Sequence, residues 1–172
     1  MNGHSELHRV TDVFCPWLLQ EGPQGIHSAA FGWAESGLVV RVVRGRKMRS
    51  LPALFDEFAA AFQFPLYFGE NTDAFDECIS DLDWAPTVAG YVVLITEPDQ
   101  VLADAEAHEL GWIVGSFTSA TQEWAQPIDR GEWWDRPAVP FHVVLAGEGD
   151  VVERAARVWA TVGPEPAPLG NL

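Results

Sequence analysis

Three short apolar runs stand out from the hydrophobic pattern of the chain. They are LVVRVV at 38–43, VVLIT at 92–96 and FHVVLA at 141–146. The runs are apolar and contain β-branched residues, with turn residues nearby, which is typical of β-strands. The run FHVVLA is continuous and not alternating, which indicates a strand of the buried kind.

Between and after these runs, apolar residues recur at helical spacing. Ser50 can cap the first such segment, with Pro52 in its opening turn, where a missing N–H costs nothing. The predicted helices are 51–62, 73–83, 101–109, 112–124 and 150–161. Strands separated by helices pair in parallel through right-handed crossovers. The pattern therefore predicts an α/β fold with a small three-stranded parallel sheet packed with helices.

Three regions follow from this pattern. Residues 38–146 hold the predicted sheet and form the main domain. Residues 1–37 show no sustained period, and this N-terminal extension could hold one or two short strands. Residues 147–172 are predicted to be a C-terminal helix followed by the Pro-rich tail GPEPAPLGNL, which is expected to be disordered.

Charge is distributed very unevenly along the chain. The formal net charge is −15. Residues 50–129 contain fifteen Asp and Glu and no Lys or Arg, whereas five of the ten bases lie in 41–49. Such a negative field repels nucleic acid and anionic membranes and attracts basic proteins. A surface that only keeps the protein soluble is the alternative explanation.

The acidic residues are most ordered in the predicted helix 73–83. Its apolar side consists of Ala74, Phe75, Cys78, Ile79 and Leu82. Its other side consists of Asp73, Asp76, Glu77, Asp81 and Asp83, with no base among them. Like charges four residues apart on a helix repel by roughly 0.3 kcal/mol per pair. An acidic face that is left unbalanced in this way indicates that a cationic partner supplies the compensation.

The segment before this helix adds aromatic surface. Tyr67 and Phe68 precede Gly69, which can let a partner approach the backbone closely. Aromatic anchors beside charged groups are typical of the energetic centre of a protein interface. The alternative is that the two rings belong to the core and that Gly69 and Asn71 only shape a turn. Asn71 or Thr72 can cap the helix that follows.

The motif Y-[YF]-G-x-N-x-D-A-x-x-[DE]-C-[LI] is complete in YFGENTDAFDECI, and the chain here resembles the barstar family of intracellular inhibitors of the ribonuclease barnase. The resemblance covers residues 39–84, and the later strands fit the family's three-stranded parallel sheet in order. It implies a barstar-like domain over 38–146. It also implies a protein that confers immunity by covering a ribonuclease active site with an acidic loop and helix.

The resemblance also implies which residues contact the partner. Tyr67, Gly69, Asn71, Asp73 and Glu77 occupy the family's contact positions, and Asp76 lies where a neighbouring contact is expected. Asp81, on the same acidic face, is added from the charge pattern. The family usually has Asp at position 77 and a larger residue at position 76. Glu106 and Glu109 are candidates for a further acidic contact on a later helix.

The sequence has few signs of a metal, redox or phosphate-binding site. The histidines are scattered, Cys15 and Cys78 lack metal-site spacing and are expected to stay reduced, and no phosphate-binding motif occurs. We expect a cytoplasmic, cofactor-free binding protein that is not an enzyme and whose partner is a basic ribonuclease or another toxin nuclease. An enzyme that uses Asp73 and Glu77 as acid and base is the alternative from another class.

The sequence leaves two alternatives for the role of a pair of tryptophans. Trp133 and Trp134 lie in a predicted loop, GEWWDRP, after the fourth predicted helix. The pair could extend the interface, or the loop could fold back over the core.

Overall fold

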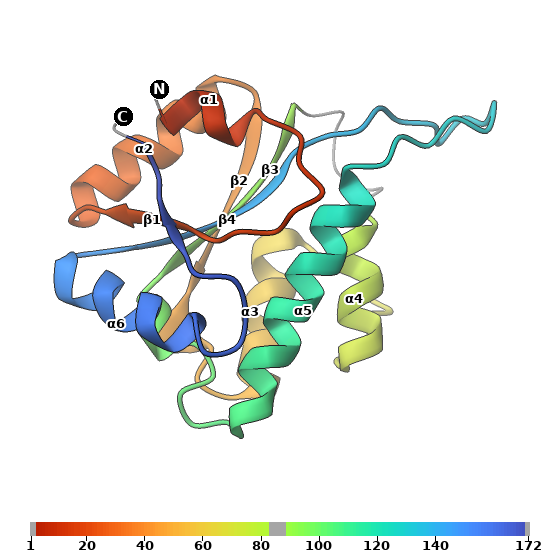
Figure 1. Ribbon diagram of the computed structural model, residues 1–172. Helices are drawn as coiled ribbons and strands as arrows, with labels where there is room; N and C mark the ends of the chain where they lie inside the picture. The colour runs from red at the N-terminus through yellow and green to blue at the C-terminus, as the bar shows by residue number, and fades with distance from the viewer. Residues whose placement is uncertain (1–2, 83–88, 171–172) are drawn as a thin grey trace.

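A single parallel sheet organises the protein in the computed structural model, which describes residues 3–82 and 89–170 (Figure 1). The strand order is β2-β3-β4-β1-β5, and every neighbouring pair is parallel. The strands are β1 (Trp17–Gln20), β2 (Leu38–Arg44), β3 (Gly90–Thr96), β4 (Phe141–Gly147) and β5 (Ala167–Pro168). The α/β class and the three predicted strands are confirmed, but a three-stranded sheet is wrong because two more strands extend it.

The two additional strands come from the segments outside the predicted domain. β1 has four residues and pairs with β4, with Trp17 opposite Val144. β5 has two residues, and the Leu169 N–H donates to the Leu18 carbonyl at 2.9 Å. Leu169 is buried in the core, so the expectation of a disordered tail is wrong for this part of it. Strands this short carry too few residues to show a period.

Helices cover both faces of the sheet. Their bounds are α1 (Gly3–Leu7), α2 (Pro23–Glu35), α3 (Leu51–Phe62), α4 (Thr72–Ser80), α5 (Ala107–Trp124) and α6 (Gly149–Trp159), with short 3-10 turns η1 (Gly45–Lys47) and η2 (Pro98–Gln100). α1 and α2 pack on one face, and α3, α5 and α6 pack on the other (Figure 1). α4 lies outside this second layer, against α5.

Two of the helix predictions are wrong in detail. In the predicted helix 101–109, residues 101–105 are a run of turns, because Leu102 has a left-handed φ of 53° and its N–H donates to Met48 O at 2.7 Å. The chain is held there by the segment before α3 and cannot form its own helical bonds. The helix predicted at 112–124 starts earlier, at Ala107. α2 was not predicted, because its two glycines and low polarity hide its period.

The centre of the sheet is buried on both faces. β3 is buried from Gly90 to Ile95 and β4 from Phe141 to Ala146, and for β4 the continuous apolar run predicted this. On the α3–α5 face, the ring of Phe75 packs edge-on against Phe58 at 5.1 Å and against Trp112 at 5.3 Å between ring centres. This aromatic cluster attaches α4 to its neighbours and determines which of its sides faces outward.

His142 links the N-terminal segment to β4. The histidine is 5% exposed, and its ring lies within hydrogen-bond distance of Trp17 Nε1 (3.3 Å) and Arg9 O (3.0 Å). Trp17 can only donate, so Nδ1 accepts and Nε2 donates to the Arg9 carbonyl. Burial lowers the pKa of His142, which keeps the ring neutral. His142 therefore has a structural role, with partners for both of its ring nitrogens.

Candidate functional site

The loop before α4 is shaped by one capping residue. Asn71 Oδ1 accepts the N–H of Ala74 at 2.9 Å, and its amide donates to Gly69 O at 3.1 Å. A side chain at Gly69 would place a Cβ 2.8 Å from the Asn71 amide nitrogen. Glycine at 69 and asparagine at 71 therefore build the start of the helix, and Asn71 is a cap as the sequence suggested.

α4 separates its two faces sharply. Phe75, Cys78 and Ile79 are buried, whereas Asp73 and Glu77 are exposed. Among the residues that the structure describes, no ion pair involves Asp73 or Glu77. The two carboxylates lie one helical turn apart on the outward side, so their charges add at the same surface.

The helix is shorter than the predicted 73–83. It ends at Ser80, and Asp81 is extended at φ −133° and ψ 90°. Leu82 is buried, and the indole N–H of Trp124 donates to Ile79 O at 3.0 Å. These contacts with the core and α5 end the helix, which periodicity alone could not show. Asp81 is exposed beyond that end, and Asp83 lies outside the described residues.

Asp76 is directed differently from its acidic neighbours. It is half-buried, and its carboxylate accepts a hydrogen bond from the hydroxyl of Ser116 on α5. Ser116 itself is 4% exposed. Asp76 thus joins α4 to α5, and its expected contact with a partner stays a prediction.

The two aromatic residues of the loop have separate environments. Tyr67 is 85% exposed, whereas Phe68 is half-buried and packs edge-on against Phe55 and Phe64. Phe68 therefore belongs to the core. Tyr67 does not, and it stands beside the acidic face with most of its ring in solvent.

Glu106 and Glu109 lie at the start of α5. Glu109 accepts the backbone N–H of Glu106 at 3.0 Å, which completes a capping box. The carboxylate of Glu106 lies 3.5 Å from His108. Both candidate acids thus have a local structural role, and their role as a further contact stays a prediction.

A hollow of about 530 Å³, which we call the α4–α5 groove, lies beside the acidic face. Glu77, Asp81 and Glu123 line it together with Trp134. Trp133 is 87% exposed and Trp134 is 42% exposed, so the loop does not fold back over the core. Sequence reasoning missed Glu123 because it lies on another helix, 46 residues after Glu77.

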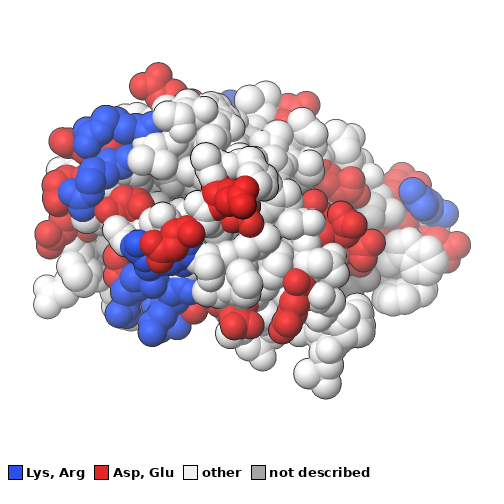
Figure 2. Space-filling model, turned by 90° about the horizontal axis from the view of Figure 1, so that it is seen from below, with Lys and Arg blue, Asp and Glu red and all other residues white. Residues whose placement is uncertain are grey.

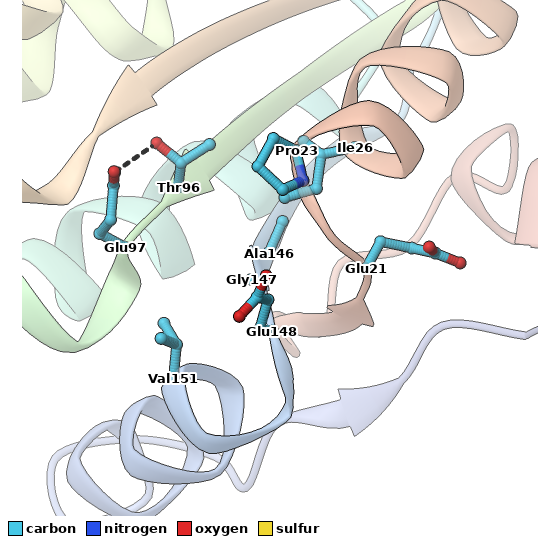
Figure 3. Close-up of a pocket in the computed structure, with 9 residues that line it drawn as sticks. All are labelled: Glu21, Pro23, Ile26, Thr96, Glu97, Ala146, Gly147, Glu148 and Val151. Carbon is cyan, nitrogen blue, oxygen red and sulfur yellow. Dashed lines mark hydrogen bonds between the residues drawn. The ribbon is translucent and has the colours of Figure 1, made fainter.

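A second hollow lies at the carboxyl ends of β1, β3 and β4 (Figure 3). In open parallel sheets, ligands bind at such an end where neighbouring strands connect in opposite directions. β1 and β4 meet this condition, because β1 leads through α2 to β2 at one edge and β4 leads through α6 to β5 at the other. The hollow, of about 310 Å³, is lined by Glu21, Glu97 and Glu148. These carboxylates would repel the phosphates of a nucleotide.

The two cysteines show no sign of a reactive site. Both cysteines are free thiols. Burial, with the nearby charges of Glu77 and Asp81, raises the pKa of Cys78, so this residue stays a weak nucleophile. No helix in the described part of the chain is long and apolar enough to cross a membrane.

Comparison with solved structures finds a protein of similar fold. Cdc6p from Pyrobaculum aerophilum is similar with a TM-score of 0.51 and 13% sequence identity over 90% of this chain. The chain spans only 38% of that protein's length, and at this identity the likeness concerns the fold alone. Among curated proteins, no sequence matches.

Comparison with protein families is more specific. A family model described as "Barstar (barnase inhibitor)" matches residues 38–146. The match includes the Asn71 cap and the outward carboxylates of α4, and it covers more than half of the chain. The protein therefore belongs to the Barstar family.

Proposed function

We propose that the protein is a cytoplasmic inhibitor of a barnase-type ribonuclease and confers immunity by covering the basic active site of that enzyme. One observation carries the proposal. Asp73 and Glu77 stand exposed on the outward side of α4 without an ion pair among the described residues. Family membership supports it, because the matched family is one of barnase inhibitors.

Complementary charge explains how such an inhibitor would act. A ribonuclease active site binds an RNA phosphate with cationic side chains, and two carboxylates on one helix turn can replace that phosphate. Opposed fields speed the encounter, and desolvated charge pairs then slow dissociation. Barnase and barstar are a standard example of both effects, so this logic is general to the family.

The rigid support of α4 makes the carboxylates effective. The Asn71 cap fixes the first turn, and Phe75 is enclosed by rings from α3 and α5. Binding then requires little ordering of the backbone, which would otherwise reduce affinity. Tyr67 lies at the same end and supplies an exposed ring.

We further propose that the protein is not an enzyme and needs no cofactor. The raised pKa of Cys78 leaves that thiol without the thiolate character of a nucleophile. The glutamates around the strand ends disfavour a phosphate-bearing substrate there.

A different toxin nuclease is a second candidate partner. Asp76 turns toward Ser116, and Glu77 carries one more methylene than the usual Asp of the family. Both features change the shape of the acidic face while keeping its charge. A basic nuclease with another active-site geometry would fit the altered face.

A ribonuclease-inhibition assay tests the proposal. Purified protein is titrated against a barnase-type ribonuclease on a small RNA substrate, at low salt and again at about 0.5 M salt. We expect inhibition with an end point at one inhibitor per enzyme, and slower association at high salt because salt screens exposed charges. Undiminished ribonuclease activity at excess inhibitor would argue against a ribonuclease and favour the second candidate.

A further inference from the structure

The loop between α5 and β4 is a structured arm. Residues 125–138, which we call the Trp arm, leave the end of α5 and project from the body of the protein (Figure 1). Ile128 and Arg136 pair as an antiparallel bridge, with N–H to carbonyl distances of 2.8 and 3.0 Å. The Trp arm is therefore a short ribbon closed by a tip.

One carboxylate holds the tip together. Asp135 accepts the backbone N–H groups of Arg130, Gly131 and Glu132 at 2.7–3.1 Å. These hydrogen bonds, with that from Arg130 first, lower the pKa of Asp135. The carboxylate stays charged and acts as a cap for three N–H groups that the ribbon leaves without partners.

A second residue fixes the base of the Trp arm. The guanidinium of Arg136 lies 4.3 Å from the ring centre of Trp124 and donates to the carbonyl of Gln126 at 2.9 Å and to that of Glu123 at 3.2 Å. Arg136 also lines the α4–α5 groove, but its charge is committed to this ring and these carbonyls. The Trp arm is thus held in place by the chain itself.

This rigid arm presents two tryptophans to solvent. Trp133 and Trp134 pack edge-on at 5.3 Å between ring centres, with 87% and 42% of their surfaces exposed. An exposed indole lacks the stabilisation that burial of its apolar surface would give. Tryptophans are also the residues most enriched among the energetic centres of protein interfaces. Rings held rigidly in solvent are suited to contact another protein.

The geometry points to a second half of the partner-binding surface. We propose that the α4–α5 groove receives an arginine or lysine side chain of the basic partner, between the ring of Trp134 and the carboxylates of Glu77 and Glu123. The inference rests on the proposed function, because Glu77 belongs to both surfaces. Carboxylates bind the charge directly and an aromatic face attracts a cation, so the lining matches one kind of occupant.

The charge of the groove supports this occupant. Glu123 is exposed on the last turn of α5, and within residues 3–82 and 89–170 no ion pair engages its side chain or that of Glu77. The groove is continuous with the outward face of α4 through Glu77. A partner that covers α4 would therefore meet the Trp arm next.

Variants of the Trp arm test the inference on the complete chain. The dissociation constant for a catalytically inactive barnase-type ribonuclease is measured for Trp134→Ala, Trp134→Phe and Trp133→Ala. Phe31→Ala is the matched control, because Phe31 is 63% exposed on α2, on the other face of the sheet. We expect Trp134→Ala to weaken binding at least tenfold, Trp134→Phe to keep part of the affinity, and Phe31→Ala to change nothing.

The outcomes separate this inference from the proposed function. If Asp73→Ala and Glu77→Ala weaken binding but Trp134→Ala and Trp133→Ala bind like wild type, the groove inference is wrong and the inhibitor proposal stands. If wild-type protein does not bind the ribonuclease, the inhibitor proposal fails and a second probe decides on the groove.

This second probe is N-acetyl-arginine amide, which is titrated at low salt while the indole N–H signal of Trp134 is followed by NMR. We expect that signal to shift in wild type and not in Glu77→Gln/Glu123→Gln. An unshifted Trp134 signal, or an equal shift in the double variant, would overturn the inference.

Discussion

Five basic side chains lie between Arg41 and Arg49, and four acidic ones lie between Asp73 and Asp81. In the basic segment, three of the five have partners within the chain: Arg44 with Glu57 at 2.7 Å, Arg46 with Glu97 at 3.4 Å and Arg49 with Asp104 at 2.6 Å. In the acidic segment, Asp73 and Glu77 have no ion pair among the described residues. Figure 2 shows one face of the protein, on which most Lys and Arg gather at the left close to Asp and Glu, whereas acidic side chains in the middle have no base beside them.

The contrast separates charge that the fold uses from charge that the fold leaves for a partner. One pair of the basic segment joins β2 to α3, and the other two join η1 and the segment before α3 to the turns after β3. Exposed pairs of this kind add little to stability because solvent screens them. On α4, Asp73 gains from the helix dipole in the first turn, but Asp73 and Glu77 repel each other and neither has a cationic partner among the described residues. Substitutions in the first region should therefore change stability, and those in the second should change binding.

Charge reversal on α4 should give the largest effect. We expect Glu77→Lys to weaken ribonuclease binding at least about 1000-fold, because a like charge at a desolvated contact costs several kcal/mol. The melting temperature should stay constant or rise, since the repulsion with Asp73 is removed and a base near a helix C-terminus is favourable. Titration calorimetry and thermal unfolding measure both.

Glu153→Lys is the matched control for this reversal. Glu153 is exposed on α6, and its substitution changes the net charge by the same amount. If Glu153→Lys weakened binding as much as Glu77→Lys, the overall field and not the α4 face would account for recognition.

Truncation of single carboxylates should have the next largest effect. Asp73→Ala and Glu77→Ala should each weaken binding by about 2 kcal/mol or more, as for central interface residues. Near-wild-type affinity for both in calorimetry would remove these residues from the interface.

Ionic strength should act mainly on association. Raising salt from about 50 mM to 500 mM should slow the association rate about tenfold or more and change the dissociation rate much less. Stopped-flow fluorescence can follow this through the exposed tryptophans. A salt-independent association rate would indicate that the acidic face does not steer the encounter.

Removal of an internal pair should have the smallest effect, and only on stability. Arg44 lowers the pKa of Glu57, so this pair stabilises the fold fully above the ordinary Glu value of about 4.3. As pH falls below that value, the unfolded chain takes up the proton first and the stabilisation is lost. We expect Glu57→Gln to lower the melting temperature at pH 7 by about 2 °C or less, because solvent screens the exposed Arg44.

The same variant should flatten the decline of stability in acid. Its affinity for the ribonuclease should equal that of wild type, because Glu57 faces Arg44 and not the outward side of α4. A clear loss of affinity in Glu57→Gln would contradict the assignment of stability to the basic segment and of binding to the acidic one.

The sequence predicted the part of the fold where local pattern and packing agree. The continuous apolar runs of β3 and β4 are plain in the sequence, and so is the helical spacing of Leu54, Phe55 and Phe58 on α3. β1 and β5 are too short to have a period, and their place in the sheet depends on distant partners. The helix prediction failed at 101–105 because backbone hydrogen bonds to the segment before α3 override local propensity.

The candidate site was predictable to a similar degree. The acidic face and the Asn71 cap lie in one continuous segment, so spacing was enough to find them. The bond between Asp76 and Ser116 joins residues 40 positions apart, and the α4–α5 groove combines α4, α5 and the Trp arm. Only the packing of α4 on α5 brings these groups together.

The most direct measurement is calorimetric titration of an inactive barnase-type ribonuclease with wild type and with Asp73→Asn/Glu77→Gln. Both substitutions keep size and remove charge, and the free energy of unfolding of each protein is measured alongside. We predict one-to-one binding by wild type and an affinity at least about 1000-fold lower for the double variant, with stability unchanged within about 0.5 kcal/mol. Equal affinity for the two folded proteins would contradict the claim that α4 carries its charge for a cationic partner.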